Sequence, residues 1–414
     1  MQRLEFLLIG VVLMPHSTLA ATIHVPGDQP TIQAGINVAQ EDDVVLVAAG
    51  DYSGPGNREI TFGGKDLVVT SEEGPKQTRI LPGGECAFHV AGSEGPVIRG
   101  FTIESGRQAI YCEPLTSPTV EDCRLLRCIG SSAGAAMVSS EETVVRRCLF
   151  QYNLAYFEQG GAVYGSGVFE ECMFISNGGF KNYEGGAIFG WDLTIAGCQF
   201  IDNGAGGFKF DLFGEGGALY ISGNNTITDC SFVGNVADQV GGAIKISNDE
   251  GTTIIERCLF HDNRAGGGGA IASPQALFVR ESTFSANESE TLGGAFIGAT
   301  ATFERTIVWG NCAVGEGDEM FGGNITFICS ATDSSGLAGG SFIFEGDQVF
   351  EDPIFCGPAP CGSPGGDYTL SAASPCTPES SPCGRLIGAL GVGCVPPTVV
   401  ERGTWGWIKA PFRR

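Results

Sequence analysis

A short motif, Cys-x-Phe-x-x-Asn, recurs along the middle of this chain. Its five full copies are Cys148, Phe150, Asn153; Cys172, Phe174, Asn177; Cys198, Phe200, Asn203; Cys230, Phe232, Asn235; and Cys258, Phe260, Asn263. Degenerate copies follow at Ser282–Asn287 and Thr306–Asn311. A second motif, Gly-Gly-Ala plus an apolar residue, alternates with the first and begins at Gly160, Gly185, Gly216, Gly241, Gly268 and Gly293. Self-similarity at a period of roughly 25 residues is the signature of a solenoid.

The residue types within one repeat predict short strands joined by tight corners. Cys and Phe stand two positions apart, so on a strand their side chains share a face. Asn follows where the chain must turn, because Asn tolerates the left-handed backbone region. The Gly pair allows a second bend. No such coil can bury its apolar face alone, so the coils must stack, and Cys, Phe and Asn should each form a ladder.

The predicted fold is therefore all-β: a single-stranded right-handed parallel β-helix with a short N-terminal capping helix. The cap is expected within 30–39, where Ile32, Ile36 and Ala39 have helical spacing. A helix there would cover the first coil, which would otherwise expose core and strand edges.

The two motifs together resemble the polymorphic outer membrane protein repeat of exported bacterial adhesin-like proteins. The matching region spans 148–311. The N-terminal segment resembles the cap of pectin-lyase-like β-helices, a group that includes pectin esterases. Residues after Asn311 are too few for the C-terminal barrel of an autotransporter, so adhesion and self-translocation do not follow automatically from the resemblance.

Four regions are expected along the chain. Residues 1–20 have the basic start, apolar run and small residue of a signal peptide. The β-helix should span 21–345, with the repeats at 148–311. A Cys- and Pro-rich segment follows at 346–395. The linker and tail at 396–414 carry Trp405, Trp407 and basic residues, which suggests recognition by export or anchoring machinery or, alternatively, a cap on the last coil.

The charge balance excludes one class of partner. The formal net charge is −24, with only 23 Lys and Arg residues. Nucleic-acid binding needs clustered Lys and Arg, so no nucleic-acid partner is expected. No transmembrane segment is expected in the mature chain, because the apolar run at the N-terminus is too short to span a bilayer.

The sixteen cysteines could bind a metal or form disulfides. Zinc sites use close Cys or His pairs, whereas the ladder cysteines are a whole coil apart, so no metal or cofactor is expected. Buried small residues in a column are the simpler interpretation of the ladder. Disulfides between adjacent coils stay open, because a coil spacing of about 4.8 Å lies within the permitted Cα range.

Catalytic sets known from this fold are not recognisable in the sequence. Polygalacturonase-like, pectate-lyase-like and pectin-esterase-like enzymes each need a characteristic group of acidic and basic residues, and none is present as a set. His261-Asp262 fills variable positions of a repeat, where an ordinary surface corner is expected. We therefore predict no catalytic residues.

The longest departure from the repeat is the candidate ligand-binding loop. It lies between Asn203 and Gly216 and carries Phe208, Lys209, Phe210, Asp211 and Phe213. Loops on solenoids commonly carry binding function. The alternative is that these Phe side chains fold back onto the solenoid wall.

Taken together, the sequence predicts an exported, non-catalytic bacterial surface protein, structural or adhesin-like. It would be secreted or associated with the outer membrane, and its partner would be a polysaccharide or a surface protein. The alternative is a diverged polysaccharide lyase or glycoside hydrolase on a pectin-lyase-like β-helix.

Overall fold

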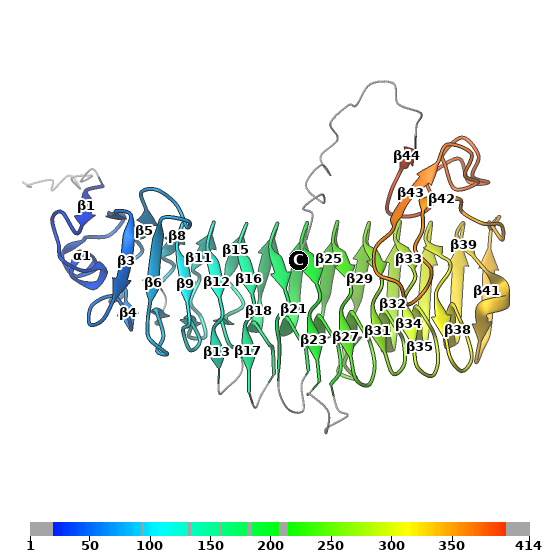
Figure 1. Cartoon of the computed structure of the whole chain (residues 1–414), viewed down its shortest axis with the longest axis horizontal. Helices are drawn as coiled ribbons and strands as arrows, with labels where there is room; N and C mark the ends of the chain where they lie inside the picture. Colours follow the sequence, from blue (N-terminus) through cyan, green and yellow to red (C-terminus); the bar gives the residue numbers. More distant parts are fainter. Residues whose placement is uncertain are drawn as a thin grey trace, which may run out of the picture.

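The computed structural model describes residues 20–92, 94–130, 134–156, 159–179, 184–206 and 214–394. It is a long stack of parallel coils with a helix at one end and a loop-rich segment on one wall (Figure 1). The predicted parallel β-helix is confirmed. Among the described residues, no helix is long and apolar enough to cross a membrane.

Three parallel sheets form the walls. Sheet A consists of β1 (Thr22–Val25), β2 (Val44–Val47), β4 (Ile60–Thr61), β5 (Val68–Ser71), β7 (Phe88–Val90), β8 (Val97–Arg99), β10 (Ile110–Cys112), β11 (Thr119–Glu121), β14 (Met137–Ser139), β15 (Val144–Arg146), β18 (Val163–Glu170), β21 (Ile188–Ala196), β24 (Leu219–Ser222), β25 (Asn225–Thr228), β28 (Ile244–Ile246), β29 (Thr253–Glu256), β32 (Ile271–Arg280), β35 (Phe296–Glu304), β38 (Met320–Ile328), β40 (Leu337–Ala338) and β41 (Ser341–Glu345).

Sheet B consists of β3 (Gly50–Ser53), β6 (Thr78–Leu81), β9 (Thr102–Glu104), β12 (Arg124–Leu126), β16 (Leu149–Gln151), β19 (Met173–Ile175), β22 (Gln199–Ile201), β26 (Ser231–Val233), β30 (Leu259–His261), β33 (Thr283–Ser285), β36 (Ile307–Val308) and β39 (Ala331–Thr332). Sheet C consists of β13 (Ile129–Gly130), β17 (Leu154–Ala155), β20 (Gly178–Gly179), β23 (Gly204–Ala205), β27 (Val236–Ala237), β31 (Arg264–Ala265), β34 (Glu288–Ser289) and β37 (Cys312–Ala313). The short strands of sheet C lie between the Asn and Gly-Gly-Ala motifs.

The helix α1 (Ile32–Val38) covers the first coil. Thr31 caps its N-terminus by accepting a hydrogen bond from the backbone N–H of Ala34. Ile32 and Ile36 are buried against the core. A helix is thus present where the apolar spacing predicts one, and it closes the end of the stack.

Two ladders of like side chains run through the interior. The five full-motif Phe rings and Phe284 are fully buried, and their centroids lie 4.5–4.9 Å apart along the stack. The Asn side chains form an unbroken chain from Asn153 to Asn311, in which each Nδ2 donates to the Oδ1 of the next. The ladder therefore satisfies polar groups that would otherwise be buried without partners.

The corner differs in one detail from the sequence expectation. The residue in the left-handed region is the one before each Asn, as at Tyr152, Ser176 and Asp262. Asn itself turns inward because its amide is needed in the ladder. The left-handed position then accepts varied side chains, which face outward.

The Asn ladder ends on a buried carboxyl group. Asn311 Nδ2 donates to Glu319 Oε2 at 2.6 Å, and the backbone N–H of Gly310 donates to Oε1 at 2.7 Å. Burial nevertheless outweighs these hydrogen bonds and raises the pKa of Glu319 to about 7. The folded protein therefore retains a proton at this site at pH values where the unfolded chain has lost it.

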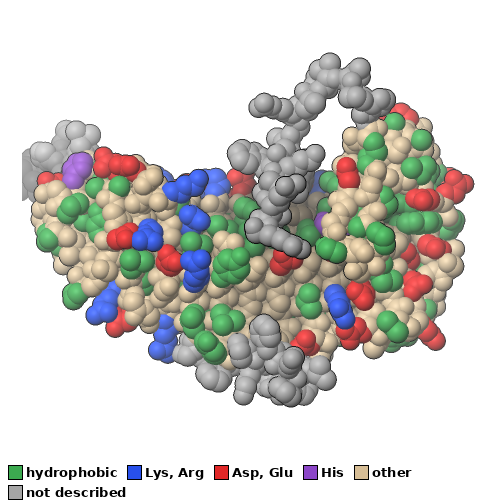
Figure 2. Space-filling view, in the orientation of Figure 1, with side chains coloured by type: hydrophobic (Ala, Val, Ile, Leu, Met, Phe, Trp, Pro, Cys, Tyr) green, Lys and Arg blue, Asp and Glu red, His purple; other side chains and the backbone are tan. Residues whose placement is uncertain are grey.

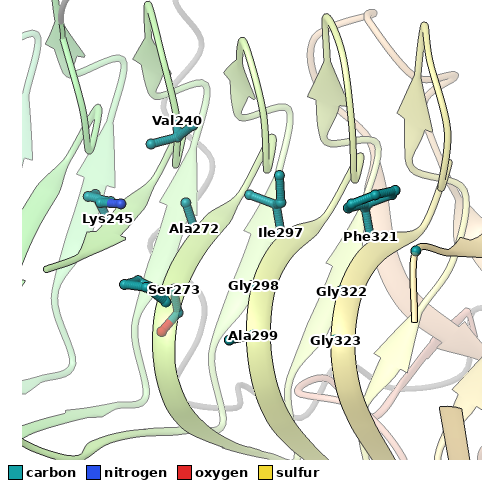
Figure 3. A pocket seen from close by; sticks show the side chains of 12 residues that line it. Val240, Lys245, Ala272, Ser273, Ile297, Gly298, Ala299, Phe321, Gly322 and Gly323 are labelled. Atoms are coloured by element: carbon teal, nitrogen blue, oxygen red, sulfur yellow. The ribbon is translucent and has the colours of Figure 1, made fainter. Parts of the chain in front are cut away.

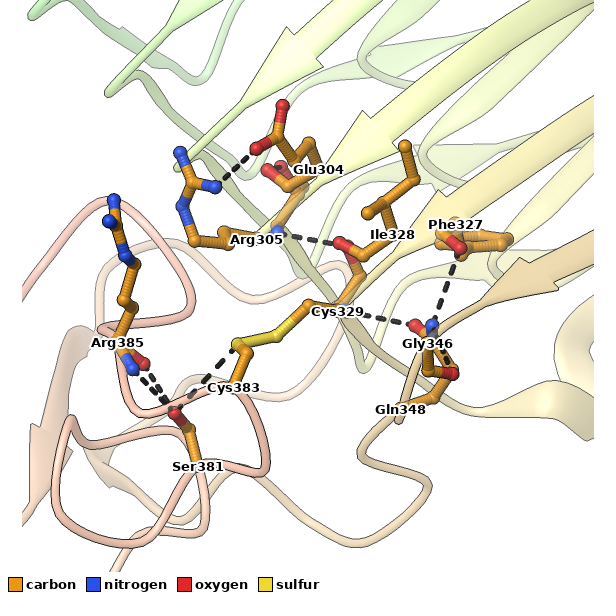
Figure 4. Close-up of a disulfide and its surroundings, with 12 residues drawn as sticks. Glu304, Arg305, Phe327, Ile328, Cys329, Gly346, Gln348, Ser381, Cys383 and Arg385 are labelled. Atoms are coloured by element: carbon orange, nitrogen blue, oxygen red, sulfur yellow. Dashed lines mark hydrogen bonds and ion pairs between the residues drawn. A yellow bond between two sulfur atoms is a disulfide. The ribbon is translucent and has the colours of Figure 1, made fainter.

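Three disulfides attach the C-terminal segment to the solenoid. Cys312–Cys361 and Cys329–Cys383 join the last coils to the segment, and Cys356–Cys394 closes the segment on itself. Figure 4 shows Cys329–Cys383 and its surroundings. Its strands β42 (Phe355–Gly357), β43 (Asp367–Ser371) and β44 (Val392–Cys394) form a separate small sheet. The ladder cysteines are unpaired and buried, so disulfides between adjacent coils do not form there.

We predict that thiol counting will separate the two cysteine classes. Ten cysteines are free and nine of these are buried, Cys86 being the partly exposed one. Alkylation of the native protein should reach Cys86 alone, because the others are enclosed by the core. Intact mass should show ten adducts after unfolding without reductant and sixteen after reduction. Fewer than ten adducts before reduction would contradict the free ladder.

We predict that Glu319→Gln will change how stability depends on pH. The folded-state pKa of about 7 exceeds the usual 4.5, so this group's stabilising proton is present below 4.5 and is lost as pH rises through 7. That difference corresponds to about 3 kcal/mol. Between pH 5 and 7.5 the wild type should therefore lose more stability than Glu319→Gln in denaturant titrations. Glu316→Gln, at an exposed carboxyl group nearby, should behave as the wild type does.

Candidate active site on sheet A

An outward-facing row of side chains runs along sheet A across seven coils. Strand register aligns Tyr164, Phe189, Tyr220, Lys245, Ala272, Ile297 and Phe321. The three aromatic rings stack on one another, with centroids 5.5 and 5.1 Å apart. Large aromatic side chains therefore form the first part of the row, the aromatic wall, and Lys245 and the small Ala272 follow them.

A shallow trough begins where this wall ends. It has a volume of about 450 Å³ and is lined by Val240, Lys245, Ala272, Ser273, Pro274, Ile297, Gly298, Ala299, Phe321, Gly322, Gly323 and Gly339 (Figure 3). The small residues have a structural cause. A Cβ added at Gly298 would lie 2.3 Å from the carbonyl oxygen of Ser273, so no larger residue can occupy this bend without moving the backbone. The trough is open along the solenoid axis, a shape that accommodates a chain-like ligand.

A column of polar side chains stands beside the aromatic wall. It comprises Gln159, Glu184 and Glu215, each of which directly precedes a Gly-Gly pair. Glu184 and Glu215 are bridge partners on neighbouring coils, and Val240 at the trough follows in the same column. The repeat therefore brings two carboxyl groups together at one end of the trough.

The two carboxyl groups have different surroundings. Glu184 Oε2 accepts a hydrogen bond from Gln159 Nε2 at 2.7 Å. Burial is the largest influence on Glu184 and raises its pKa, and the charge of Glu215 acts in the same direction. Glu215 pairs instead with Lys245, whose Nζ lies 3.9 Å from Oε2. Glu184 is thus suited to hold a proton, while Glu215 faces a cation.

Tyr220 completes this cluster. Burial raises its pKa to about 12, and the charges of Glu184, Glu215 and Asp249 add to the effect. Its hydroxyl group therefore stays protonated at neutral pH and is available to donate a hydrogen bond. Asp249 belongs to the short insertion at 247–251.

Sequence reasoning missed this cluster, although a signal was present. Glu184, Glu215, Tyr220 and Lys245 occupy variable positions around the Gly-Gly-Ala motif, where each looks like an ordinary surface residue. Alignment of the copies shows Gln, Glu and Glu in three successive repeats at the position before Gly-Gly. A run of polar residues at one repeat position becomes one local site when the coils stack.

The structure places the other candidate residues as follows. The ladder residues are in the interior. The candidate loop with Phe208, Lys209, Phe210, Asp211 and Phe213 lies outside the described residues. His261 and Asp262 do not form an ordinary surface corner: their side chains are only 11 and 9% exposed, because the C-terminal segment covers them. No group of three or more His, Cys, Asp and Glu side chains suited to a metal occurs within the described ranges.

Comparisons with known proteins agree with the fold. A family model described as right handed beta helix region matches residues 162–315. No curated protein sequence matches the chain. The right-handed parallel β-helix is confirmed, whereas the specific relation to polymorphic outer membrane proteins is not.

Several solved structures are similar to this chain. One is a PL6 alginate lyase in complex with a trisaccharide, at 10% identity and a TM-score of 0.42, covering 90% of this chain and 95% of that one. A mannuronic-acid-specific family 6 lyase from human gut microbiota matches at 12% identity and 0.42, covering 79 and 82%. The catalytic unit of a GH87 α-1,3-glucanase from Streptomyces thermodiastaticus matches at 15% identity and 0.39, covering 82 and 66%.

These findings correct the functional expectation from sequence. The chain was expected to be a non-catalytic surface protein without catalytic residues, and that expectation is wrong: the neighbours are polysaccharide lyases and a glucanase. Identities of 10–15% and TM-scores below 0.5 do not transfer an activity. The proposal below therefore depends on the side chains of sheet A.

We predict that Lys245→Met will raise the pKa of Glu184 further. The positive charge of Lys245 lowers the pKa of Glu184, whereas burial and the charge of Glu215 raise it. Removing the ammonium group should therefore raise the pKa. NMR titration of carbon-13-labelled glutamate would measure the change, with Glu184→Gln assigning the resonance. Lys76→Met, at an exposed lysine far along the chain, should leave the titration unchanged. An unaltered Glu184 titration in Lys245→Met would contradict the arrangement.

Proposed function

We propose that this protein is an exported enzyme that hydrolyses glycosidic bonds in a polysaccharide bound along the trough of sheet A. The observation that carries the proposal is the pair Glu184 and Glu215 on neighbouring coils, with burial raising the pKa of Glu184. Two carboxyl groups of unlike environment are the usual minimum for glycoside hydrolysis.

Each residue has a defined role in this proposal. Glu184 donates its proton to the glycosidic oxygen as the bond to the anomeric carbon breaks. Glu215 acts as the carboxylate, either by adding to the anomeric carbon or by taking a proton from the attacking water. Lys245 and Gln159 hold the two carboxyl groups in place, and Tyr220 donates a hydrogen bond to the sugar.

The charge of the site favours a neutral polysaccharide. Glu215 pairs with Lys245, Glu184 lies near the same cation, and Asp249 adds a negative charge near Tyr220, while the whole chain carries a net charge of −24. A polyuronate would meet like charge at every residue, which disfavours its binding. The open ends of the trough suit cleavage within a chain.

Secretion, or attachment at the bacterial outer membrane surface, belongs to the same proposal. The apolar run near the N-terminus is typical of a signal peptide. The three disulfides favour an oxidising compartment, since such bonds are rare in the cytosol. A polysaccharide too large to enter a cell would be reached there.

The test is hydrolysis of purified neutral glucans and mannans, followed by the release of reducing ends. Glu184→Gln should lower kcat by about 100-fold or more, because general acid catalysis commonly contributes that much. Glu316→Gln is the matched control, since Glu316 occupies the same column away from the pair and is exposed. Wild-type activity should fall as pH rises through the pKa of Glu184, which loses its proton there. Unsaturated products, or full activity in Glu184→Gln and Glu215→Gln, would contradict the proposal.

A further inference from the structure

A second concave surface lies on sheet B, between the solenoid wall and the C-terminal segment. This groove has a volume of about 570 Å³. Ile201, Val233 and Leu259 project from β22, β26 and β30 to form its floor, and Tyr368 and Leu390 of the C-terminal segment form the opposite side. Figure 1 shows the segment lying against the wall near β33.

Several outward positions on sheet B are apolar beyond the groove, although Gln151 lies beside Ile175 in the same row. Leu149, Met173 and Ile175 continue the face along the preceding coils, and Met173 is 37% exposed. Outer faces of solenoids are normally polar, and a contiguous apolar patch indicates an interaction site. The patch needs an occupant with apolar side chains.

Acidic groups lie beside the groove. Asp202 directly follows Ile201, and its pKa is raised by burial and by the charge of Asp262. Among the described residues no Lys, Arg or His forms an ion pair with Asp202. Asp262 Oδ2 pairs with His261 Nδ1 at 2.9 Å, whereas its Oδ1 is buried and has no hydrogen-bond partner in the described structure. A positively charged occupant would compensate these carboxylates.

The chain itself supplies a segment of this chemistry. The described structure stops at Cys394, in a strand that pairs with β43, and β43 contributes Tyr368 to the groove. Residues 395–414 include Trp405, Trp407, Ile408 and Phe412, and they carry Arg402, Lys409, Arg413 and Arg414 against Glu401 alone.

We propose that the C-terminal tail, residues 395–414, binds in the sheet B groove of its own chain. The aromatic residues lie on Ile201, Val233 and Leu259, and the basic residues face Asp202 and Asp262. Trp405 is eleven residues beyond Cys394, which allows a reach of up to about 36 Å. Attachment beside the groove also gives the tail a high effective concentration there.

The groove and the trough lie on different sheets, so this inference is independent of the proposed hydrolysis. Acidic side chains are scattered over the surface at the C-terminal end of the solenoid (Figure 2). Tail binding therefore stabilises and shields one wall while the other stays open to substrate. Variants of the groove should leave hydrolysis of polysaccharide unchanged.

Photo-crosslinking in the full-length chain tests the proposal. With benzoylphenylalanine in place of Trp407, we expect crosslinks within one chain that map by mass spectrometry to 199–261. Val233→Asp should reduce the yield about tenfold or more, because a carboxylate would then be buried against the aromatic residues. Val236→Asp is the matched control: it lies three residues on, is 44% exposed on sheet C, and should leave the yield unchanged.

Hydrogen exchange provides a second measurement that needs no substitution in the groove. Amides of the tail should be protected in the wild-type chain, and amides of β22 and β26 should exchange more slowly there than in a chain truncated after Cys394. Crosslinks between two copies, crosslinks to other surfaces, or fast exchange throughout the tail would overturn the proposal. The last result would leave the tail free for recognition by export machinery.

Discussion

Contact between like side chains on successive coils is the interaction on which the structure depends. A coil of three short strands has almost no interior of its own, so its apolar residues are buried only by the coils above and below. The stacked Phe rings and the hydrogen-bonded amides from Asn153 to Asn311 are the contacts that join each coil to the next. Both ends of the stack are closed. Helix α1 covers the first coil, and Glu319 accepts a hydrogen bond from Asn311, the last amide of the Asn ladder.

The same constraint explains why function lies on the outside. Positions that point inward hold mostly apolar or small residues and the Asn of the ladder, because a large polar or charged side chain there would disturb both neighbouring coils. Positions that point outward are free to differ from copy to copy. Glu184, Glu215 and Lys245 occupy such positions, and the stacking of the coils places them together. The rigid register of sheet A supplies the preorganisation that a catalytic pair needs.

The C-terminal segment covers part of sheet B, whereas sheet A has no such cover among the described residues. The disulfides of the segment hold it against the last coils and over His261 on sheet B. The trough of sheet A continues along the axis. The proposed polysaccharide site and the proposed tail site therefore lie on different faces of the solenoid.

The sequence by itself determined the fold class, because a repeat that alternates two motifs permits one way of burying Phe and Asn. It also indicated the capping helix and the inward ladder residues. It did not reveal the acid pair, since Glu184 and Glu215 are 31 positions apart and neither belongs to a recognisable catalytic motif. Only the tertiary structure decided that these side chains share a site, and that the cysteines of the last coils pair with the C-terminal segment. The physical reason is that coil register and the path of the last loops set distances between residues remote in sequence, whereas local patterning specifies only which face each residue prefers.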